Sequence, residues 1–194
     1  ALVTLYCYYN QLTSLDVSAN TALVTLSCYG SSPTSSHGVT NQITELDVSN
    51  NTALTSLYCY YNQLTSLDVS ANTALQTLSF YGSSSGSSYG VTNQITALDV
   101  SNNTALTSLY CYTNQLTALD VSTNTALTYL HCGTNQITAL DVSANTALTV
   151  LYCYYNQLTA LDVNANTALQ TLACGGSSPT SSHGVTNQIT ALDV

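Results

Sequence analysis

Hydrophobic and polar positions alternate in two short segments that recur along the whole chain. In TLYCY, at residues 4–8, the alternation directs Leu5 and Cys7 inward and the two Tyr side chains outward, as on a β-strand. In TSLDV, at residues 13–17, Leu and Val point inward and Asp16 points outward. No stretch has an apolar stripe of helical period. The pattern therefore predicts two short strands per repeat and little or no regular helix.

The repeat unit has 21 residues, and some units carry ten more. Cysteines in equivalent positions fall 21, 31, 52, 21, 21 and 21 residues apart, and Phe80 splits the longest interval into 21 and 31. The Cys column comprises Cys7, Cys28, Cys59, Cys111, Cys132, Cys153 and Cys174. The chain thus divides into eight coils, at residues 1–21, 22–52, 53–73, 74–104, 105–125, 126–146, 147–167 and 168–194.

Pairs of coils form a larger unit. Odd coils contain NQLT and even coils contain NQIT, and only even coils carry an insert. The inserts lie near residues 30–40, 82–92 and 176–186, and their Ser, Thr and Gly content predicts loops. One coil cannot bury its own apolar side, whereas stacked coils share a continuous core. Residues 1–194 are therefore expected to form a single array.

The stretch LVTLYCYYNQL fits the leucine-rich repeat pattern L-x-x-L-x-L/C-x-x-N-x-L. With its continuation TSLDVSANT, the chain resembles the 21-residue leucine-rich repeats of secreted and surface proteins of Bacteroides-like bacteria, whose form is close to LxxLxCxxNxLTxLDVSxNT. The resemblance extends over the whole chain. It implies an all-β-rich solenoid of eight stacked coils with parallel, in-register strands, and an extracellular or cell-surface location. One departure is Ala19, since that family commonly has Lys in the SxNT turn.

The charge of the chain narrows the choice of partners. There is no Lys or Arg, and nine acidic residues give a formal net charge of −9. Nucleic acid and anionic membrane surfaces both require cationic side chains. No apolar run reaches the ~18 residues of a membrane span, so we expect no membrane insertion. A protein or glycan ligand, or other copies of the chain, remain as partners. Since the sequence has no Met and no signal peptide, we expect a processed product or part of a longer protein.

Two columns of repeated residues have a structural interpretation. The Cys column is predicted to be buried and inert, because Phe80 in one position is incompatible with a disulfide or metal ladder. An Asn ends the first segment of each coil, where its amide can bond the backbone of the neighbouring coil. We call it the Asn10 column: Asn10, Asn41, Asn62, Asn93, Asn114, Asn135, Asn156 and Asn187.

A column of unpaired carboxylates raises the question of what stabilises it. Neighbouring carboxylates ~5 Å apart repel by ~3 kcal/mol at an effective dielectric constant of ~20. Each Asp could accept hydrogen bonds from the following turn, could be protonated through a raised pKa, or could bind Ca²⁺. We expect no cofactor, and Ca²⁺ is the one metal for which these residues are candidates. The Asp column comprises Asp16, Asp47, Asp68, Asp99, Asp120, Asp141, Asp162 and Asp193.

Outward tyrosines are the best candidates for binding. They could stabilise the sheet across strands, or they could bind sugars or proteins through a rigid aromatic area with a hydroxyl. The candidates are Tyr6, Tyr8, Tyr58, Tyr60, Tyr110, Tyr112, Tyr152 and Tyr154. The three coils with inserts have small residues at the Tyr6 position, Ser27, Ser79 and Ala173. We therefore hypothesise that each insert folds across them.

Two further surface features carry alternatives. Asn50 and Asn102 stand in N-x-T sequences and are candidates for N-glycosylation. A Thr column suggests the surface chemistry of ice-binding solenoids, and it comprises Thr13, Thr44, Thr65, Thr96, Thr117, Thr138, Thr159 and Thr190.

The pattern favours a non-enzymatic extracellular scaffold for adhesion or ligand recognition through its Tyr-rich strand face and Ser-rich loops. No nucleophile or acidic pair stands out from the columns, and a repeated surface offers no unique pocket for catalysis. One alternative is a self-assembling subunit of an extracellular filament, because the last residues ALDV and the first residues ALVTL lack only one turn between them. A third possibility is an ice- or surface-binding Thr array.

Overall fold

The structure is a computed structural model that describes residues 1–31, 40–83, 92–176 and 186–194. Most of each insert lies outside these residues, as do His37 and His183. The hypothesis that the inserts cover Ser27, Ser79 and Ala173 therefore stays a prediction.

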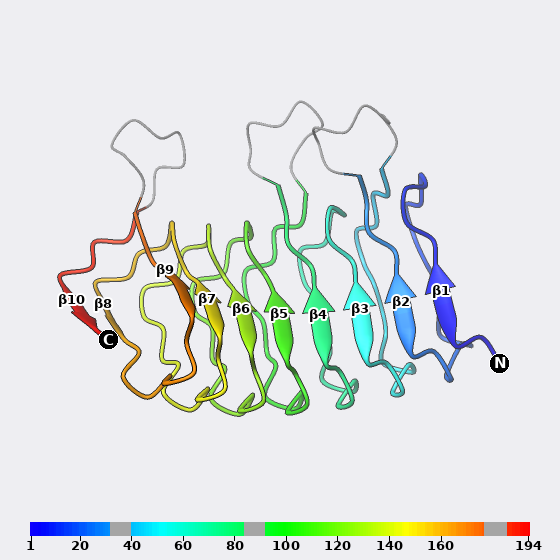
Figure 1. Cartoon of the computed structure of the whole chain (residues 1–194). Helices are drawn as coiled ribbons and strands as arrows, with labels where there is room; N and C mark the ends of the chain where they lie inside the picture. Colours follow the sequence, from blue (N-terminus) through cyan, green and yellow to red (C-terminus); the bar gives the residue numbers. More distant parts are fainter. Residues whose placement is uncertain (32–39, 84–91, 177–185) are drawn as a thin grey trace.

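The chain winds into a solenoid with one parallel sheet along one side (Figure 1). Eight strands are hydrogen-bonded in the order β1-β2-β3-β4-β5-β6-β7-β9, and β8 and β10 form a separate pair. The strands are β1 (Thr4–Tyr6), β2 (Thr25–Ser27), β3 (Ser56–Tyr58), β4 (Thr77–Ser79), β5 (Ser108–Tyr110), β6 (Tyr129–His131), β7 (Val150–Tyr152), β8 (Ala160–Asp162), β9 (Thr171–Ala173) and β10 (Ala191–Asp193). No helix occurs in the part of the chain that the structure describes.

The register places equivalent positions of successive coils beside each other. Leu5 pairs with Leu26, and Leu26 pairs with Leu57, although an insert separates the latter two. The same alignment continues to the last pair of the sheet, where Leu151 is paired with Leu172. Each repeated position therefore becomes a column along the solenoid, as the sequence predicts.

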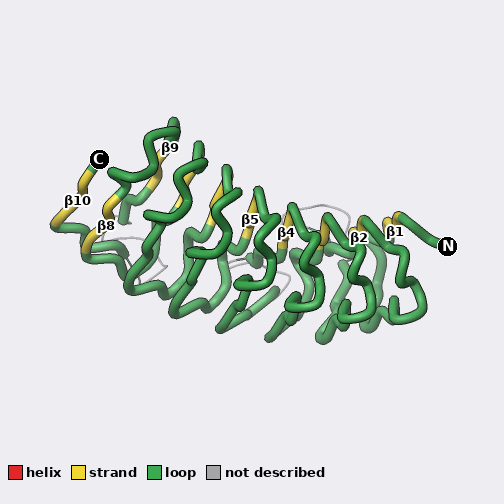
Figure 2. Tube along the Cα trace, turned by 90° about the horizontal axis from the view of Figure 1, so that it is seen from below, coloured by secondary structure: helices red, strands yellow, loops and turns green. Residues whose placement is uncertain are grey.

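The prediction of a second strand in every coil is wrong for most coils. Only β8 and β10 form there, with Leu161 paired to Leu192. Between most other coils this side carries a single backbone bond, such as Gln63 N–H to Ile43 C=O at 2.9 Å. One bond per coil does not make a strand ladder. Figure 2 shows the main strands along one side of the coils and mostly irregular chain around the rest.

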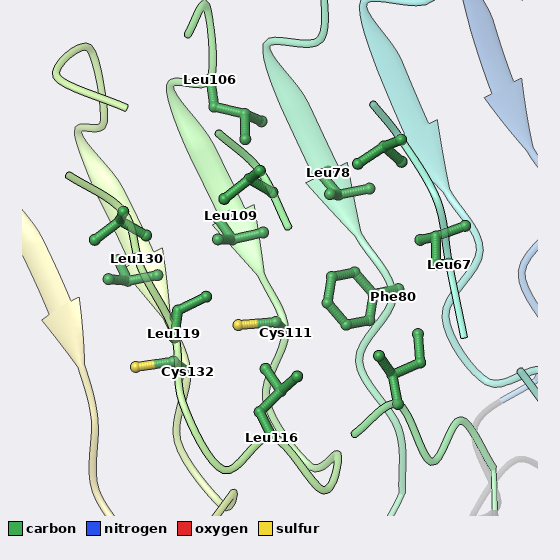
Figure 3. Packing of buried hydrophobic residues seen from close by; sticks show 14 of the residues in the cluster. Leu67, Leu78, Phe80, Leu106, Leu109, Cys111, Leu116, Leu119, Leu130 and Cys132 are labelled. Atoms are coloured by element: carbon green, nitrogen blue, oxygen red, sulfur yellow. The ribbon is translucent and has the colours of Figure 1, made fainter. Parts of the chain in front are cut away.

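The core lies between the sheet and the opposite side of the coil. Figure 3 shows Leu109 and Cys111 from the sheet side facing Leu116 and Leu119. Five cysteines of the Cys column are fully buried, and Phe80 occupies the equivalent position of the fourth coil in the same core. Cys7 and Cys174 are half-buried in the terminal coils. Burial raises the pKa of the Cys59 thiol to about 12, which keeps it protonated and unreactive at neutral pH.

The turn after each strand has unusual backbone geometry. The ninth residue of the coil lies in this turn, and its φ is positive, at 54–55°, in five coils: Tyr9, Tyr61, Thr113, Thr134 and Tyr155. Coils with inserts have glycine here instead. A Cβ on Gly30 would meet the backbone carbonyl of Tyr61, and a Cβ on Gly82 would meet that of Thr113. Close approach of the next coil, rather than a left-handed conformation, explains these glycines.

Candidate functional site

Charge is confined to one side of the coil. The nine acidic residues are Glu45 and the eight members of the Asp column, and all of them are exposed. None belongs to the eight-stranded sheet or to the residues that directly follow its strands. The outer face of the sheet, which we call the sheet face, therefore carries no charged carboxylate. It presents tyrosine, serine and threonine side chains instead.

A continuous stack of tyrosine rings runs along the edge of the sheet face. We call Tyr8, Tyr29, Tyr60, Tyr81 and Tyr112 the tyrosine stack. Ring centroids are 4.7 Å apart for Tyr8–Tyr29 and 4.2 Å for Tyr29–Tyr60. The distance is 4.3 Å for Tyr60–Tyr81 and 4.2 Å for Tyr81–Tyr112. Interplanar angles of 7–12° make all four pairs parallel. In-register coils impose this arrangement, because equivalent Cβ atoms lie one strand spacing apart.

The stack ends at a substitution in the sixth coil. Gly133 replaces tyrosine there, and the His131 ring, 4.0 Å from Tyr112, occupies the next place in the stack. The Tyr154 ring lies over Gly133, where an added Cβ would come within 2.9 Å of it. The Tyr154 hydroxyl and His131 Nε2 share a hydrogen bond of 2.9 Å. Burial lowers the pKa of His131 to about 4, so the imidazole is neutral at pH 7.

Burial also changes the acidity of the stacked phenols. It raises the pKa of Tyr81 to about 12, and it raises the pKa values of Tyr29, Tyr60 and Tyr112. Like-charge repulsion between neighbouring phenolates contributes in the same direction. Tyr29, Tyr60, Tyr81 and Tyr112 are therefore neutral phenols at any physiological pH.

The second row of tyrosines is more separated. Tyr6 is 65% exposed, and Tyr58, Tyr110 and Tyr152 are half-buried. Tyr58 stands in register between the buried Ser27 and Ser79, so small side chains flank its ring. The rings of the tyrosine stack cover one another, whereas the faces of this second row are less covered by neighbouring rings.

Sequence reasoning missed several aromatic contacts. Tyr9 and Tyr61 lie edge-on against the tyrosine stack, with centroids 5.3 Å from Tyr29 and 5.1 Å from Tyr81 respectively. Tyr129 lies 4.7 Å from Tyr110 and 6.0 Å from Tyr152, bridging the second row. The YYN motif, present in three of the four odd coils, was the available signal for the edge-on rings. The side to which they turn depends on the positive φ, which the pattern does not reveal.

The Asn10 column forms the predicted ladder. Asn41 Nδ2 donates to the carbonyls of Cys7 and Cys28 at 3.0 and 2.9 Å, and its Oδ1 accepts from Leu12 N–H at 3.0 Å. This confirms the structural interpretation of these residues.

A second Asn ladder, not predicted, runs through the SxNT turns. Asn72 Nδ2 donates to the carbonyls of Val48 and Asn51, both at 2.9 Å. The Oδ1 atoms of six residues in this ladder have no hydrogen-bond partner within the described residues: Asn51, Asn72, Asn103, Asn124, Asn145 and Asn166.

The Asp column caps its own turns. Asp16 Oδ1 accepts the Ser18 N–H at 2.9 Å, and the equivalent bond recurs in coils two to seven. Hydrogen bonds from the Ser hydroxyl and backbone lower the pKa of six of these carboxyls: Asp16, Asp47, Asp68, Asp99, Asp120 and Asp141. The alternative of raised pKa values is therefore wrong for these six.

The glycosylation candidates and the Thr column lie on the surface. Asn50 and Asn102 are both exposed, and so is every member of the Thr column.

Across the described ranges, no group of three or more His, Cys, Asp or Glu side chains is arranged to hold a metal ion. Nor does any helix within those ranges have the length and hydrophobicity of a membrane span.

Comparison with solved structures identifies the architecture as a leucine-rich repeat solenoid. The functional domain of InlJ from Listeria monocytogenes, which includes a cysteine ladder, is 36% identical over 99% of this chain, with a TM-score of 0.61. Internalin C2 of the same species is 22% identical over 98% of the chain, with a TM-score of 0.71. A leucine-rich repeat protein of Leptospira interrogans is 19% identical over the full chain, with a TM-score of 0.58.

The chain spans 43% of the InlJ structure and 80% of the internalin C2 structure. No protein-family model matches the chain, and no curated protein matches it. The Bacteroides-like origin of the repeat stays a prediction.

Proposed function

We propose that this chain is a non-enzymatic scaffold, displayed outside the cell or on its surface, that recognises an uncharged part of a protein or glycan through its sheet face. The observation that carries the proposal is the separation of charge from aromatic surface. All carboxylates lie on the Asp side, whereas two rows of tyrosines cover the sheet face. Rigid rings with a hydroxyl suit neutral, hydroxylated or apolar ligands.

Within the sheet face, the second row of tyrosines is the proposed contact. Rings of the tyrosine stack cover one another, which leaves mainly their edges for a ligand. Tyr58 has serines on both sides, and Tyr6 is 65% exposed. A ligand lying along the sheet face would meet the rings of this row in turn. Tyr8, Tyr60, Tyr112 and Tyr154 would then line the edge of the contact.

A binding assay with matched variants tests the proposal. The probes are an array of immobilised neutral and anionic oligosaccharides and a panel of purified extracellular proteins. The triple change Tyr58→Ser, Tyr110→Ser and Tyr152→Ser should weaken binding about tenfold or more, since aromatic anchors commonly contribute over 1 kcal/mol each. The control, Thr65→Ser, Thr117→Ser and Thr159→Ser, alters the exposed Thr column and should leave affinity unchanged.

The dependence of binding affinity on salt concentration provides a second test of the proposal. Contact through the uncharged sheet face predicts an affinity that is nearly constant between low and high salt. Binding that weakens steeply with salt, or that the Thr variants abolish while the Tyr variants do not, would place the contact on the acidic side and contradict the proposal.

The other proposed functions have less support. Residues in core positions, such as Leu2 and Leu192, are exposed at the two ends of the array, as they are in any segment of a solenoid, so their exposure does not favour a filament. An ice-binding Thr surface would have to include the charged Asp column, which runs three residues away in every coil. Calcium binding by the Asp column, glycosylation at Asn50 and Asn102, and the lack of enzymatic activity stay predictions.

A further inference from the structure

The tyrosine stack brings phenol rings of neighbouring coils into direct contact. Tyr60 lies 4.2 Å from Tyr29 and 4.3 Å from Tyr81, centroid to centroid, with interplanar angles of 12° and 9°. Tyr81 and Tyr112 repeat this geometry at 4.2 Å. These distances place the ring planes in van der Waals contact, and they join residues 21 or 31 positions apart in the sequence.

The composition of the chain leaves tyrosine as its most abundant accessible oxidisable side chain, beside the half-buried thiols of Cys7 and Cys174. There is no Met and no Trp, and the cysteines of the inner coils are buried with raised thiol pKa values. The chain has 15 Tyr and a single Phe, which is itself in the core. The hydroxyl of Tyr60 also hydrogen-bonds to those of Tyr29 and Tyr81, so the phenol groups of neighbouring coils are held together along the stack.

We infer that the tyrosine stack is a site of oxidative cross-linking, at which a peroxidase acting with hydrogen peroxide joins tyrosines of neighbouring coils as dityrosine. This inference is independent of the proposed ligand binding. The half-buried rings present their edges to solvent, and Tyr8, at the end of the stack, is 39% exposed. Oxidation can therefore begin at the surface of the stack.

The reaction balances as follows. Each of two phenols gives one electron and its hydroxyl proton to the oxidant, and one hydrogen peroxide takes up two electrons and two protons to become two waters. The two phenoxyl radicals form one carbon–carbon bond between their ortho positions. The hydrogen on each joined carbon then moves to the phenolic oxygen, which restores both aromatic rings. The product has lost two hydrogens relative to the parent chain.

Preorganisation favours coupling within the chain over coupling between chains. Two groups held in contact react as though at very high concentration, with effective molarities of ~10⁵ M or more in favourable cases. Radicals on separate molecules must instead meet by diffusion. Cross-linking should therefore join adjacent coils of one chain covalently, without joining separate chains.

An Asp-specific protease gives a direct assay, because it releases roughly one fragment per coil from a chain that has no trypsin sites. Tyr29, Tyr60, Tyr81 and Tyr112 fall in fragments 16–46, 47–67, 68–98 and 99–119 respectively. The folded protein is treated with horseradish peroxidase and limiting hydrogen peroxide, digested, and analysed by mass spectrometry and dityrosine fluorescence. We expect each of the first three fragments to be joined to the next one, with two hydrogens lost per link.

Matched variants locate the reacting ring. Tyr60→Phe keeps the stacked ring but removes the phenol, so both links to fragment 47–67 should disappear while the link between fragments 68–98 and 99–119 remains. Tyr61→Phe alters the edge-on neighbour and should leave all three links. Thiol titration in denaturant should give the same count before and after oxidation. Links mainly between separate chains, no links, or links to fragment 47–67 that survive Tyr60→Phe would overturn the inference.

Discussion

The imidazole of His131 lies 4.0 Å from the ring of Tyr112, so a residue from one column continues the stack of another. Gly133 makes this exchange possible, because it leaves the tyrosine position empty and gives the Tyr154 ring room to lie over it. The sixth coil is thus the one place in the described residues where a histidine joins the aromatic column.

His131 should titrate with a midpoint near pH 4, because burial disfavours its charged form. Its folded pKa lies below its unfolded value of 6.5. The unfolded state therefore binds more protons between these values, and stability should fall as pH drops from 6.5 through about 4. The measurement is an NMR titration of the imidazole signal, assigned by its loss in His131→Phe. That variant should also lack this part of the pH dependence of unfolding, and a midpoint near 6.5 would contradict the prediction.

The tyrosine stack should make the protein less stable in strong alkali. Burial raises the pKa of Tyr81 to about 12 from its usual 10, and it raises those of Tyr60 and Tyr112. Since the unfolded chain loses these protons first, stability present below pH 10 should decline as pH rises through 12. Absorbance of phenolate against pH should show late-titrating tyrosines in the folded protein and a single transition near pH 10 in urea.

Gly30→Ala and Gly82→Ala should each destabilise the fold by about 1–3 kcal/mol, the usual cost of forcing atoms into a packed site. The added Cβ would meet the backbone carbonyl of the next coil, which cannot move without shifting that coil. Gly175→Ala is the matched control, because no atom of the described residues lies within 4 Å of its added Cβ. Urea unfolding of the three variants provides the comparison, and equal midpoints would refute the prediction.

Asn62→Ala should cost more stability than Asn72→Ala. The Asn62 amide donates to Cys28 and Cys59 carbonyls and accepts from Ile43 N–H, so truncation leaves groups at both of its ends unpaired. Asn72 donates to two carbonyls but its Oδ1 accepts nothing among the described residues. Each buried group left unpaired costs about 1–3 kcal/mol. Denaturant unfolding measures both variants, and the reverse order would show that the second ladder is better satisfied than its geometry indicates.

Thr134→Asn should stabilise the protein by up to about 1 kcal/mol. Thr134 has a φ of 55°, a left-handed conformation that is costly for a β-branched residue and tolerated by Asn. The expected rise in melting temperature is about 2–4 °C for a chain of this size. Thr138→Asn is the control, since Thr138 is exposed and lacks positive φ. An equal effect at both positions would show that relief of backbone strain is not the cause.

The stacking of coils could be predicted because it follows from period alone. Leu26 and Leu57 occupy equivalent positions, and any other register would expose one coil's apolar side. The second strand could not be predicted in the same way. TSLDV at Leu15 and TALDV at Leu161 both alternate as a strand does, yet only the latter lies in a strand pair. Alternation reports which side chains are buried, and it does not report whether neighbouring backbones come close enough for a ladder.

The candidate site was predictable in position but not in geometry. Alternation along the strand places Tyr60 outward, as the structure confirms. Whether its ring would lie flat on Tyr29 or open to solvent depends on rotamers that the pattern does not specify. The place of His131 was hidden for a related reason, because its orientation depends on a residue two positions later and on a tyrosine in the following coil.

The uniform register has a consequence for how such a chain can change length. Every coil meets its neighbours through the same positions, and β2 and β3 pair across an insert as readily as β1 and β2 pair without one. Gene duplication or unequal recombination can therefore add or delete whole coil pairs while each junction keeps its contacts. The length of the solenoid can therefore evolve in steps of whole coil pairs while the residues of its core stay the same.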